Sequence, residues 1–332
     1  MFDVVIPTVG RPSLGTALDA LLAGDGPRPE RILVVDDRPD RRDGPLVVPP
    51  GVDVLAGRAA GPAAARNVGW RAGSAPWVVF VDDDVVPSGS WSADLADDLA
   101  TAAPDVVGVQ GRVTVPLPTD RRPTDWERNV TGLETARWIT ADMAVRREAL
   151  AAVGGFDERF PRAYREDADL ALRLQATGGR LAVGSRRVLH PVRPAPWWVS
   201  VRLQAGNRDD VLMTALHGRH WQGDGVPRGR RRRHVATTAC GVGTLLGVAL
   251  RRPVLAAPAL AGWLAGTAEL AWARIAPGPR DPAEVAAMVA TSVALSPVAT
   301  WHWLAGLAGR RRLLDRPGPS ATAPAGHPLL PQ

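Results

Sequence analysis

The stretch Trp77-Val78-Val79-Phe80-Val81-Asp82-Asp83-Asp84 places three carboxylates directly after an unbroken apolar run. Such a run is typical of a strand that is buried on both faces, as the strands of parallel sheets are. If the chain stays extended past Val81, Asp82 and Asp84 point to the same side, because strand side chains alternate. Two carboxylates on one side make a hard oxygen site for Mg²⁺ or Mn²⁺. The alternative interpretation is a loop or helix-cap cluster of aspartates.

Short apolar runs alternate with helical patterns on either side of this stretch. The predicted strands are Asp3–Ile6, Arg31–Val35, Val52–Leu55, Trp77–Val81 and Val106–Gln110, and the predicted helices are Ser13–Ala23, Pro62–Ala72 and Trp91–Thr101. This alternation predicts an α/β domain with a mostly parallel sheet and helices on both faces. Ligands of such sheets bind at the carboxyl ends of the strands. We expect Thr8, Asp36–Asp37 and Asp82–Asp84 to lie at that edge, because each follows a predicted strand.

The next part of the chain, up to residue 195, is predicted to complete this domain. Residues 112–140 contain several prolines and are expected to be irregular but structured. A helix is predicted over Arg147–Val153, and another from Arg165 to a point before Gly178. A final pair of short strands is predicted at Leu181–Val183 and Arg187–His190.

Polar residues near the predicted strand ends each have two interpretations. Asp36 and Asp37 can accept hydrogen bonds from a base or ribose, or can form an Asp-Asp-Arg-Pro turn. Arg66 can reach a phosphate, or its alanine-rich helix can simply pack closely against another element. His190 is either a structural histidine or a metal ligand.

Glu166 and Asp167 begin a predicted helix, where carboxylates are usually stabilising caps. The functional alternative is that one of them removes a proton from a substrate hydroxyl. A base that works near neutral pH needs a raised pKa, and a neighbouring like charge supplies such a shift.

Taken together in chain order, these motifs resemble the family-2 inverting glycosyltransferases of the GT-A fold. The resemblance covers about residues 2–195. The matching segments are Val4-Val5-Ile6-Pro7-Thr8 with Arg11-Pro12, Val34-Val35-Asp36-Asp37, Ala65-Arg66-Asn67-Val68-Gly69, Phe80-Val81-Asp82-Asp83-Asp84 with Pro87, Ala141-Asp142-Met143-Ala144-Val145-Arg146-Arg147, Gly154-Gly155-Phe156-Asp157-Glu158 and Arg165-Glu166-Asp167-Ala168-Asp169-Leu170.

The resemblance implies roles for individual residues. The implied nucleotide-binding residues are Pro7, Thr8, Arg11, Asp36, Asp37, Arg66, Asp82 and Asp83. Asp82-Asp83-Asp84 resembles the family's Asp-x-Asp motif, which implies that Asp84, with Asp82 and His190, binds Mn²⁺ or Mg²⁺. Asp167 resembles the catalytic base, preceded by Glu166 as in the family's Glu-Asp pair. Asp142 stands where the family often has Asn, which implies altered contacts with the acceptor or the donor sugar.

The implied reaction is a single inverting displacement. Asp167 takes a proton from the acceptor hydroxyl, which attacks the anomeric carbon of a nucleoside-diphosphate sugar. The metal and Arg66 stabilise the departing nucleoside diphosphate. The expected acceptor is a glycan, a lipid-linked sugar or a small molecule. The family's polymerising members carry a Gln-x-x-Arg-Trp motif, which this sequence lacks, so processive polymerisation is not expected.

Composition narrows the class of partner. The chain of 332 residues has a formal net charge of +6, contains no lysine, and has a single cysteine, Cys240. One cysteine excludes an intramolecular disulfide and suits a reducing compartment. Residues Met1–Val4 lack the pattern of a secretory signal, so none is expected. Arginines cluster at 228–233 and 310–312, beside apolar segments and without interleaved aromatic residues, which favours an anionic membrane surface over nucleic acid.

After residue 195 the composition changes, and the chain is predicted to have three further parts. Residues 196–234 are predicted to form an amphipathic helix and an arginine-rich linker. Residues 235–314 are predicted to form an apolar helical region that associates with a membrane, and residues 315–332 a disordered tail. Tryptophans near the segment ends resemble an aromatic belt (Trp263, Trp272, Trp301 and Trp303). The alternative is a soluble helical bundle. The expected location is the cytoplasmic face of the membrane, or the cytoplasm.

Two other functions compete with a glycosyltransferase. A catalytically inactive, membrane-bound scaffold of the same fold is disfavoured by the intact Asp82, Asp84 and Asp167. A sugar-phosphate nucleotidyltransferase would require a glycine-rich phosphate loop with a basic residue directly after the first strand, and Pro7–Pro12 has a single glycine.

Overall fold

The computed structural model describes residues 1–42, 44–223 and 229–320, which form two compact units. The first unit contains Met1–Pro116, Leu133–Pro191 and the described residues from Leu314 onward. The second contains Leu117–Gly132 and Val192–Leu313. Most of the tail for which disorder is predicted, residues 321–332, lies outside the described residues.

The first unit is built on a single mixed sheet. Its strands are β1 (Phe2–Thr8), β2 (Arg31–Asp36), β3 (Val52–Ala56), β4 (Trp77–Val81), β5 (Val86–Pro87), β6 (Val106–Thr114), β7 (Asp142–Arg146) and β8 (Arg180–Leu189), in the order β3-β2-β1-β4-β7-β6-β8-β5. The four strands from β3 to β4 are parallel. The sheet is therefore mixed and not purely parallel as predicted: β6 and β8 are also parallel, but β7 pairs antiparallel with β4 and β6, and β5 pairs antiparallel with β8.

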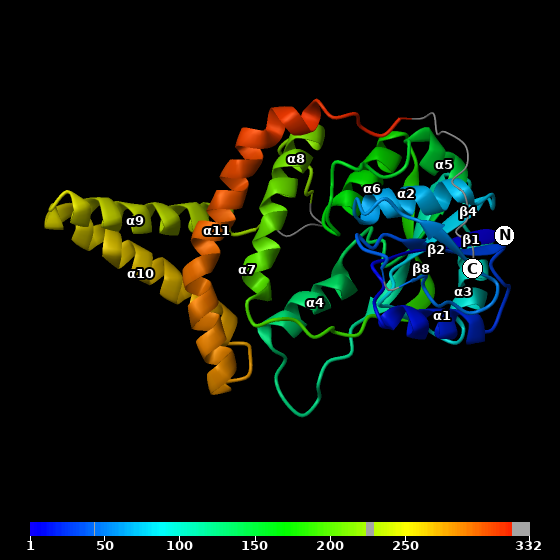
Figure 1. Ribbon diagram of the computed structural model, residues 1–332, viewed down its shortest axis with the longest axis horizontal. Coiled ribbons are helices and arrows are strands. Elements are labelled where there is room, and N and C mark those ends of the chain that lie inside the picture. The colour runs from blue at the N-terminus through cyan, green and yellow to red at the C-terminus, as the bar shows by residue number, and fades with distance from the viewer. Residues whose placement is uncertain (43, 224–228, 321–332) are drawn as a thin grey trace. The chain divides into compact units, whose positions relative to one another are not determined.

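Helices cover both faces of the sheet, as the alternating pattern predicts (Figure 1). One face is covered by α2 (Pro62–Ala72), α5 (Arg147–Ala152) and α6 (Glu166–Ala176), and the other by α1 (Ser13–Ala23) and α3 (Trp91–Ala100). The core under α2 and α6 joins Val5, Leu33 and Phe80 of the sheet to Val68 and Leu174 of the helices. Burial of this apolar surface fixes where the two helices begin, and both begin at the edge where the parallel strands end.

Helix α2 lies unusually close to β1 and β2. A β-carbon placed on Gly69 would lie 2.3 Å from Val5 Cγ1 and 3.1 Å from Val35 Cγ2. Real β-carbons do not approach other atoms that closely, so a larger residue at this position would push the helix off the sheet. Gly69 therefore sets the distance between α2 and the sheet, and with it the position of Arg66 about one turn earlier in the helix.

Two local predictions differ from the structure. The segment 112–140, expected to be irregular, contains α4 (Asp125–Thr135). Its start is a capping box: Thr124 Oγ1 accepts from Glu127 N at 3.2 Å, and Glu127 Oε2 accepts from Thr124 N at 2.7 Å. The pair of short strands expected after Gly179 is one strand, β8, because it pairs with β6 from Arg180 to Leu189, with a register shift between Val183 and Arg187.

The second unit is helical. It contains α7 (Val199–Leu203), the short 3₁₀ helix η1 (Gln204–Gly206), α8 (Asn207–His217), α9 (Arg231–Ala249), α10 (Pro253–Ile275) and most of α11 (Pro282–Leu314). The helix predicted over Pro196–Leu216 is present as α7, η1 and α8 in succession. Part of the predicted arginine-rich linker, residues 224–228, lies outside the described residues, and Arg231–Arg233 form the first turn of α9. Helices α9 and α10 lie side by side as an antiparallel pair (Figure 1).

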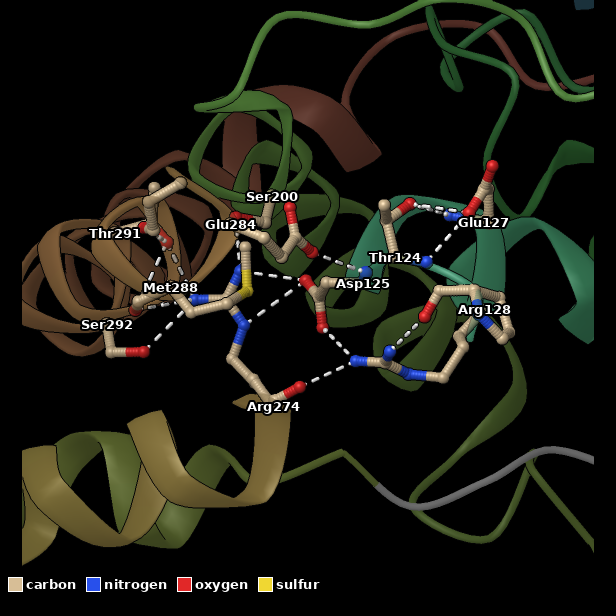
Figure 2. Close-up of polar contacts among 12 residues, drawn as sticks. Thr124, Asp125, Glu127, Arg128, Ser200, Arg274, Glu284, Met288, Thr291 and Ser292 are labelled. Carbon is tan, nitrogen blue, oxygen red and sulfur yellow. Dashed lines mark hydrogen bonds and ion pairs between the residues drawn. The ribbon is translucent and has the colours of Figure 1, made fainter. Parts of the chain in front are cut away.

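A buried arginine joins α4, α7, α10 and α11 within the second unit. The Arg274 guanidinium donates to Asp125 Oδ2 at 2.8 Å, Ser200 Oγ at 2.9 Å and Thr291 Oγ1 at 2.8 Å (Figure 2). Asp125 N donates to Glu284 Oε1 at 2.9 Å, which ties the start of α11 into the same network. A buried charge is stable only when it is paired and hydrogen-bonded, so this network fixes the carboxyl end of α10.

Two helices of the described chain, α10 and α11, are long and apolar enough to cross a membrane by length and composition. They differ in their surroundings, because 17% of the apolar window of α10 is buried and 39% of that of α11.

We predict that Gly69→Ala destabilises the protein by about 1–3 kcal/mol, because the new methyl group overlaps Val5. The matched control is Gly15→Ala in α1, where a β-carbon would have no neighbour within 4 Å. Removing a glycine from a helix interior stabilises by up to about 1 kcal/mol, so the control should be stabilised. Urea unfolding of the two variants measures the difference, and an equal gain for both would show that α2 does not lie this close to the sheet.

Candidate active site

The polar residues singled out in the sequence lie at the carboxyl edge of the parallel half of the sheet. Thr8 ends β1, Asp36 ends β2, and Asp82–Asp84 follow β4 directly. The register pairs Thr8 with Asp36, so the ends of β1 and β2 are adjacent. This is the edge at which parallel sheets bind ligands.

Arg66 of α2 connects two of the predicted site segments. Its Nη2 donates to Asp82 Oδ1 at 2.7 Å, and its Nη1 donates to Glu166 Oε1 at 2.9 Å. Only 2% of the Arg66 residue is exposed, and Phe156 lies against the guanidinium with its ring centre 5.6 Å away. One buried cation thus holds the carboxylate after β4 and the first residue of α6 at a fixed separation. Among the described residues, the Arg66 Nε has no hydrogen-bond partner.

Glu166 is kept neutral at ordinary pH by this arrangement. Burial and the neighbouring Asp167 raise the pKa of Glu166 to about 8, against the charge of Arg66, which lowers it. Arg66 supplies one positive charge for two carboxylates, and Asp82 is the more exposed of the two, with 29% of its side chain accessible. The ion pair is therefore Arg66–Asp82. Glu166 Oε2 is buried and has no partner among the described residues, so a proton on this oxygen is free to be donated to a ligand.

Asp167 lies in the first turn of α6 and is half-buried. Its Oδ1 accepts from Ala168 N at 2.7 Å, and burial raises the pKa of its carboxyl above the ordinary value. The residue before the helix, Arg165, has a left-handed backbone with φ of 77°. That conformation costs about 1–2 kcal/mol for a residue other than glycine. It turns the chain so that Glu166 and Asp167 start the helix beside Arg66.

Asp83 binds other parts of the protein. Thr8 Oγ1 donates to Asp83 Oδ2 at 2.6 Å, and Arg11 Nη1 donates to Oδ1 at 2.5 Å. Asp83 is 1% exposed, and Pro7, one residue before Thr8, is buried within β1. These contacts tie the segment after β4 to the segment after β1, and the Arg11 side chain, 38% exposed, is the part of this cluster that solvent reaches.

Asp36 and Asp37 also have protein partners. Asp36 pairs with Arg38 at 2.8 Å and Arg41 at 3.3 Å. Burial raises the pKa of Asp36, but the hydrogen bonds and charge of Arg38 outweigh it and hold the pKa below its usual value. Asp37 Oδ2 accepts from Gly61 N at 2.9 Å, at the start of α2. Asp36 therefore forms the predicted Asp-Asp-Arg-Pro turn with Arg38. Asp37 fixes the beginning of α2, the helix that contains Arg66.

The three predicted metal ligands do not form a single cluster. Asp84 Oδ1 lies 3.6 Å from His190 Nε2, whereas Asp82 is turned toward Arg66. In the part of the chain that the structure describes, no three His, Cys, Asp or Glu side chains gather to hold a metal ion. Asp84 and His190 nevertheless offer one oxygen and one nitrogen side by side, and His190 Nδ1 is buried without a hydrogen-bond partner. Two protein ligands plus ligand phosphate oxygens suit Mg²⁺ or Mn²⁺, so the pair fits such an ion.

Two further residues of these motifs have structural roles that their motifs alone do not reveal. Asn67, beside Arg66, bonds both the N and the O of Phe156, each at 2.9 Å, and so fixes the turn that places Phe156 under Arg66. Asp142, expected to alter substrate contacts, has no exposed surface. It accepts from Arg186 Nε at 2.8 Å and from Trp91 Nε1 at 3.0 Å. Its partners are protein groups, and the expected effect on substrate contacts stays a prediction.

Comparisons with known proteins agree with this geometry. Residues 3–154 match the family model described as Glycosyl transferase family 2. The chain is 35% identical over 132 residues to pre-mycofactocin glycosyltransferase from Mycobacterium tuberculosis, a match that covers 36% of this chain and 28% of that protein. The chain thus spans little more than a quarter of the length of this curated relative.

Two solved structures are similar to the chain at low sequence identity. GalNAc-T7 with UDP, GalNAc and Mn²⁺ has a TM-score of 0.50 and 15% identity, covering 72% of this chain and 50% of that chain. Glucosyl-3-phosphoglycerate synthase from Mycobacterium tuberculosis, in complex with Mn²⁺, UDP and phosphoglyceric acid, has a TM-score of 0.46 and 16% identity, covering 69% of this chain and 80% of that chain. The family match shows that residues 3–154 form a glycosyltransferase family 2 domain.

Proposed function

We propose that the protein is a metal-dependent, inverting glycosyltransferase that moves a sugar from a nucleoside-diphosphate sugar to an acceptor hydroxyl. The observation that supports this most directly is the bridge from Asp82 through Arg66 to Glu166. It joins the Asp-x-Asp segment after β4 to the paired carboxylates that begin α6. A donor bound at the first segment would have its reacting carbon within reach of the second.

The nucleotide is proposed to bind along the carboxyl edge of β1, β2 and β4, near Pro7, Thr8, Arg11, Asp36, Asp37 and Asp83. Of these residues, Arg11 has the most accessible cation that could meet a phosphate. Arg66 contributes mainly through its partners, because both of its Nη atoms are engaged and the residue is buried.

A divalent ion is proposed to bind between Asp84 and His190, with Asp82 turned toward it when the donor arrives. When bound, Mn²⁺ or Mg²⁺ would offset negative charge on the diphosphate. The Mn²⁺ in the neighbouring structures supports this choice of ion. The chain itself supplies a carboxylate oxygen and an imidazole nitrogen 3.6 Å apart.

Asp167 is proposed as the base that accepts the proton of the attacking hydroxyl. Its raised pKa makes it a stronger base than an ordinary aspartate, which suits proton transfer near neutral pH. Glu166 is proposed to stay protonated beside it and to donate from Oε2 to a substrate oxygen. Two adjacent carboxyls with different environments thus divide the roles of acceptor and donor of protons.

The proposed acceptor is a glycan, a lipid-linked sugar or a small molecule, and the proposed location is the cytoplasmic face of an anionic membrane, or the cytoplasm. The apolar helices α10 and α11 support the membrane part of this proposal. The rival interpretation, an inactive scaffold of the same fold, predicts a folded protein without donor binding.

The test of this function is calorimetric binding of UDP, GDP and dTDP to the detergent-purified chain, with and without Mn²⁺. We expect one nucleotide to bind, with a Kd at least about tenfold tighter when Mn²⁺ is present, a difference of about 1.4 kcal/mol. Asp84→Ala should abolish the effect of Mn²⁺ and leave the folded sheet intact. Failure of all three nucleotides to bind to well-folded protein would favour the scaffold.

We predict that Asp167→Asn lowers kcat by roughly a hundredfold to ten-thousandfold, the usual contribution of a general base. Nucleotide affinity should stay near that of the unaltered protein, because the asparagine keeps the shape of the carboxyl and its bond to Ala168 N. Turnover with the donor that calorimetry identifies measures the loss. Near-normal turnover would remove Asp167 from this role.

The pKa of Glu166 predicts a pH-dependent stability. The folded protein keeps the Glu166 proton up to about pH 8, whereas an unfolded glutamate loses it near 4.5. The folded state therefore binds more protons in this range, and the unfolding free energy falls as pH rises, by at most about 1.4 kcal/mol per pH unit. Glu166→Gln should flatten this decline, since its amide oxygen still accepts from Arg66. Glu148→Gln, at an exposed position of α5, is the control, and equal pH profiles for all three proteins would contradict the assignment.

A further inference from the structure

The outer ends of α9 and α10 expose an unusual concentration of large apolar side chains. Along 242–264 the exposed fraction reaches 71% at Leu245, 56% at Leu246 and 60% at Leu255. The other exposed members are Val242, Val248, Leu250, Val254, Leu260 and Leu264. Water-soluble proteins rarely leave such a contiguous apolar surface uncovered, so this surface has a partner.

The apolar residues are distributed all around the two helices. On α9, Leu245, Leu246, Val248 and Ala249 are exposed, as is Leu250 just past its end, and at about 100° per residue they span more than half of the circumference. The remaining side holds the buried Gly247, which lies against Ala256 of α10. A helix that lies flat on a membrane has one apolar and one polar face, whereas a helix that is apolar all round is surrounded by lipid or protein. The distal part of this pair therefore fits insertion into a bilayer, end first.

Charged residues bracket this apolar surface at both ends. At the base, Glu269 of α10 pairs with Arg230 at 3.0 Å and with Arg233 at 2.7 Å. At the tip, the turn between the helices contains Arg251 and Arg252. Residues 234–250 and 253–268 between these levels contain no Asp, Glu or Arg. At 1.5 Å per residue each segment is about 24 Å long.

This length suits a complete crossing of a bilayer. The hydrocarbon core is about 30 Å thick, and long arginine side chains extend the reach of a short segment at its ends. The two arginines of the tip would be costly in the middle of the bilayer, at about 2.5–3.5 kcal/mol each. They therefore belong in the opposite layer of headgroups, where anionic lipids attract them.

The backbone of the tip gives independent support. Arg252 N donates to Gly247 O at 2.8 Å and Arg251 N donates to Val248 O at 3.0 Å, which forms a Schellman turn. Arg251 has φ of 52°, at the position where such a turn usually has glycine. Arginine costs about 1–2 kcal/mol there. Because this backbone conformation disfavours arginine, we attribute the presence of Arg251 to its charged side chain.

We propose that α9 and α10 form a helical hairpin that crosses a lipid bilayer, with Arg251 and Arg252 in the far headgroup layer. Helix α11 also exposes apolar side chains such as Val289 and Trp301, but part of it packs against the base of α9. Its Ser296 bonds His234 at 3.1 Å, and its Thr300 bonds Thr238 at 3.1 Å, while Thr291 and Ser292 bind Arg274 (Figure 2). These buried hydroxyls show that α11 packs against other helices. The hairpin rests on the membrane part of the proposed function and specifies its form.

Flotation with vesicles of phosphatidylcholine and phosphatidylglycerol tests the insertion. The full chain should stay with the vesicles through washes with high salt and with alkaline carbonate, because an inserted hairpin does not depend on surface charge. Val242→Arg with Leu260→Arg should reduce the floating fraction by at least about tenfold, since both positions lie near the midpoints of the two segments and each charge adds more than about 2 kcal/mol at the membrane centre. Val47→Arg, at a 97% exposed position of the first unit, is the matched control. Release of the unaltered chain by salt would overturn the hairpin and leave only surface binding.

The position of the tip separates a crossing from a shallow contact. In a Cys240→Ala background, Arg252→Cys in protein added to preformed vesicles should resist an impermeant maleimide until detergent is added. Val47→Cys should react from outside at once. Labelling of Arg252→Cys from outside would overturn the crossing. Neither result depends on turnover, so nucleotide binding by the same preparations tests the proposed function separately.

Discussion

The buried guanidinium of Arg66 is the contact on which the arrangement of the site depends. An isolated charge in a protein interior is prohibitively unstable, so Arg66 requires Asp82 and Glu166 at hydrogen-bond distance. Those partners come from the end of β4 and the start of α6. The fold meets the requirement only if α2 lies low on the sheet, which Gly69 allows, and if the chain turns sharply at Arg165. The positions of the Asp82 and Glu166 carboxyls thus depend on how closely α2 packs against the sheet.

The same contact sets the charges of the site. Glu166 keeps its proton, because burial and the neighbouring Asp167 raise its pKa to about 8 against the charge of Arg66. The neighbouring residues Glu166 and Asp167 consequently differ in their partners, because the first bonds Arg66 and the second bonds only the backbone of its own helix. A sequence of two adjacent acids does not distinguish them. The difference arises from which side chain points at a buried cation.

The parts of the fold that sequence patterns predict are those in which local pattern and tertiary structure agree. Helices α1 and α2 begin and end where the apolar spacing and Pro62 place them, and the four parallel strands coincide with short, mainly apolar runs. Strand β7 is missed because Asp142 and Arg146 at its two ends leave only three apolar residues between them, and the pairing of Asp142 with Arg186 is invisible in the sequence. Helix α4 is missed although Thr124 and Glu127 form a recognisable capping box. In the site, residue types are predictable but partners are not: Asp36, Asp37 and Asp83 all bind protein groups first.

Helices α10 and α11 are equally apolar in composition, but the structure shows that their surroundings differ. Both are long and apolar, but α11 directs its serines and threonines toward Arg274, His234 and Thr238, where each hydroxyl has a partner. Such hydroxyls stabilise a contact between helices by hydrogen bonding, whereas a surface that faces lipid offers them no partner. Helix α10 has instead α9 on one side and exposed leucine and valine on the others, and the charges of the hairpin lie only at its two ends. The pairing of an apolar helix therefore has to be known before its composition can be assigned to a core or to a membrane. Here the structure pairs α10 with α9, although α9 is not among the helices that are long and apolar enough to cross a membrane by composition.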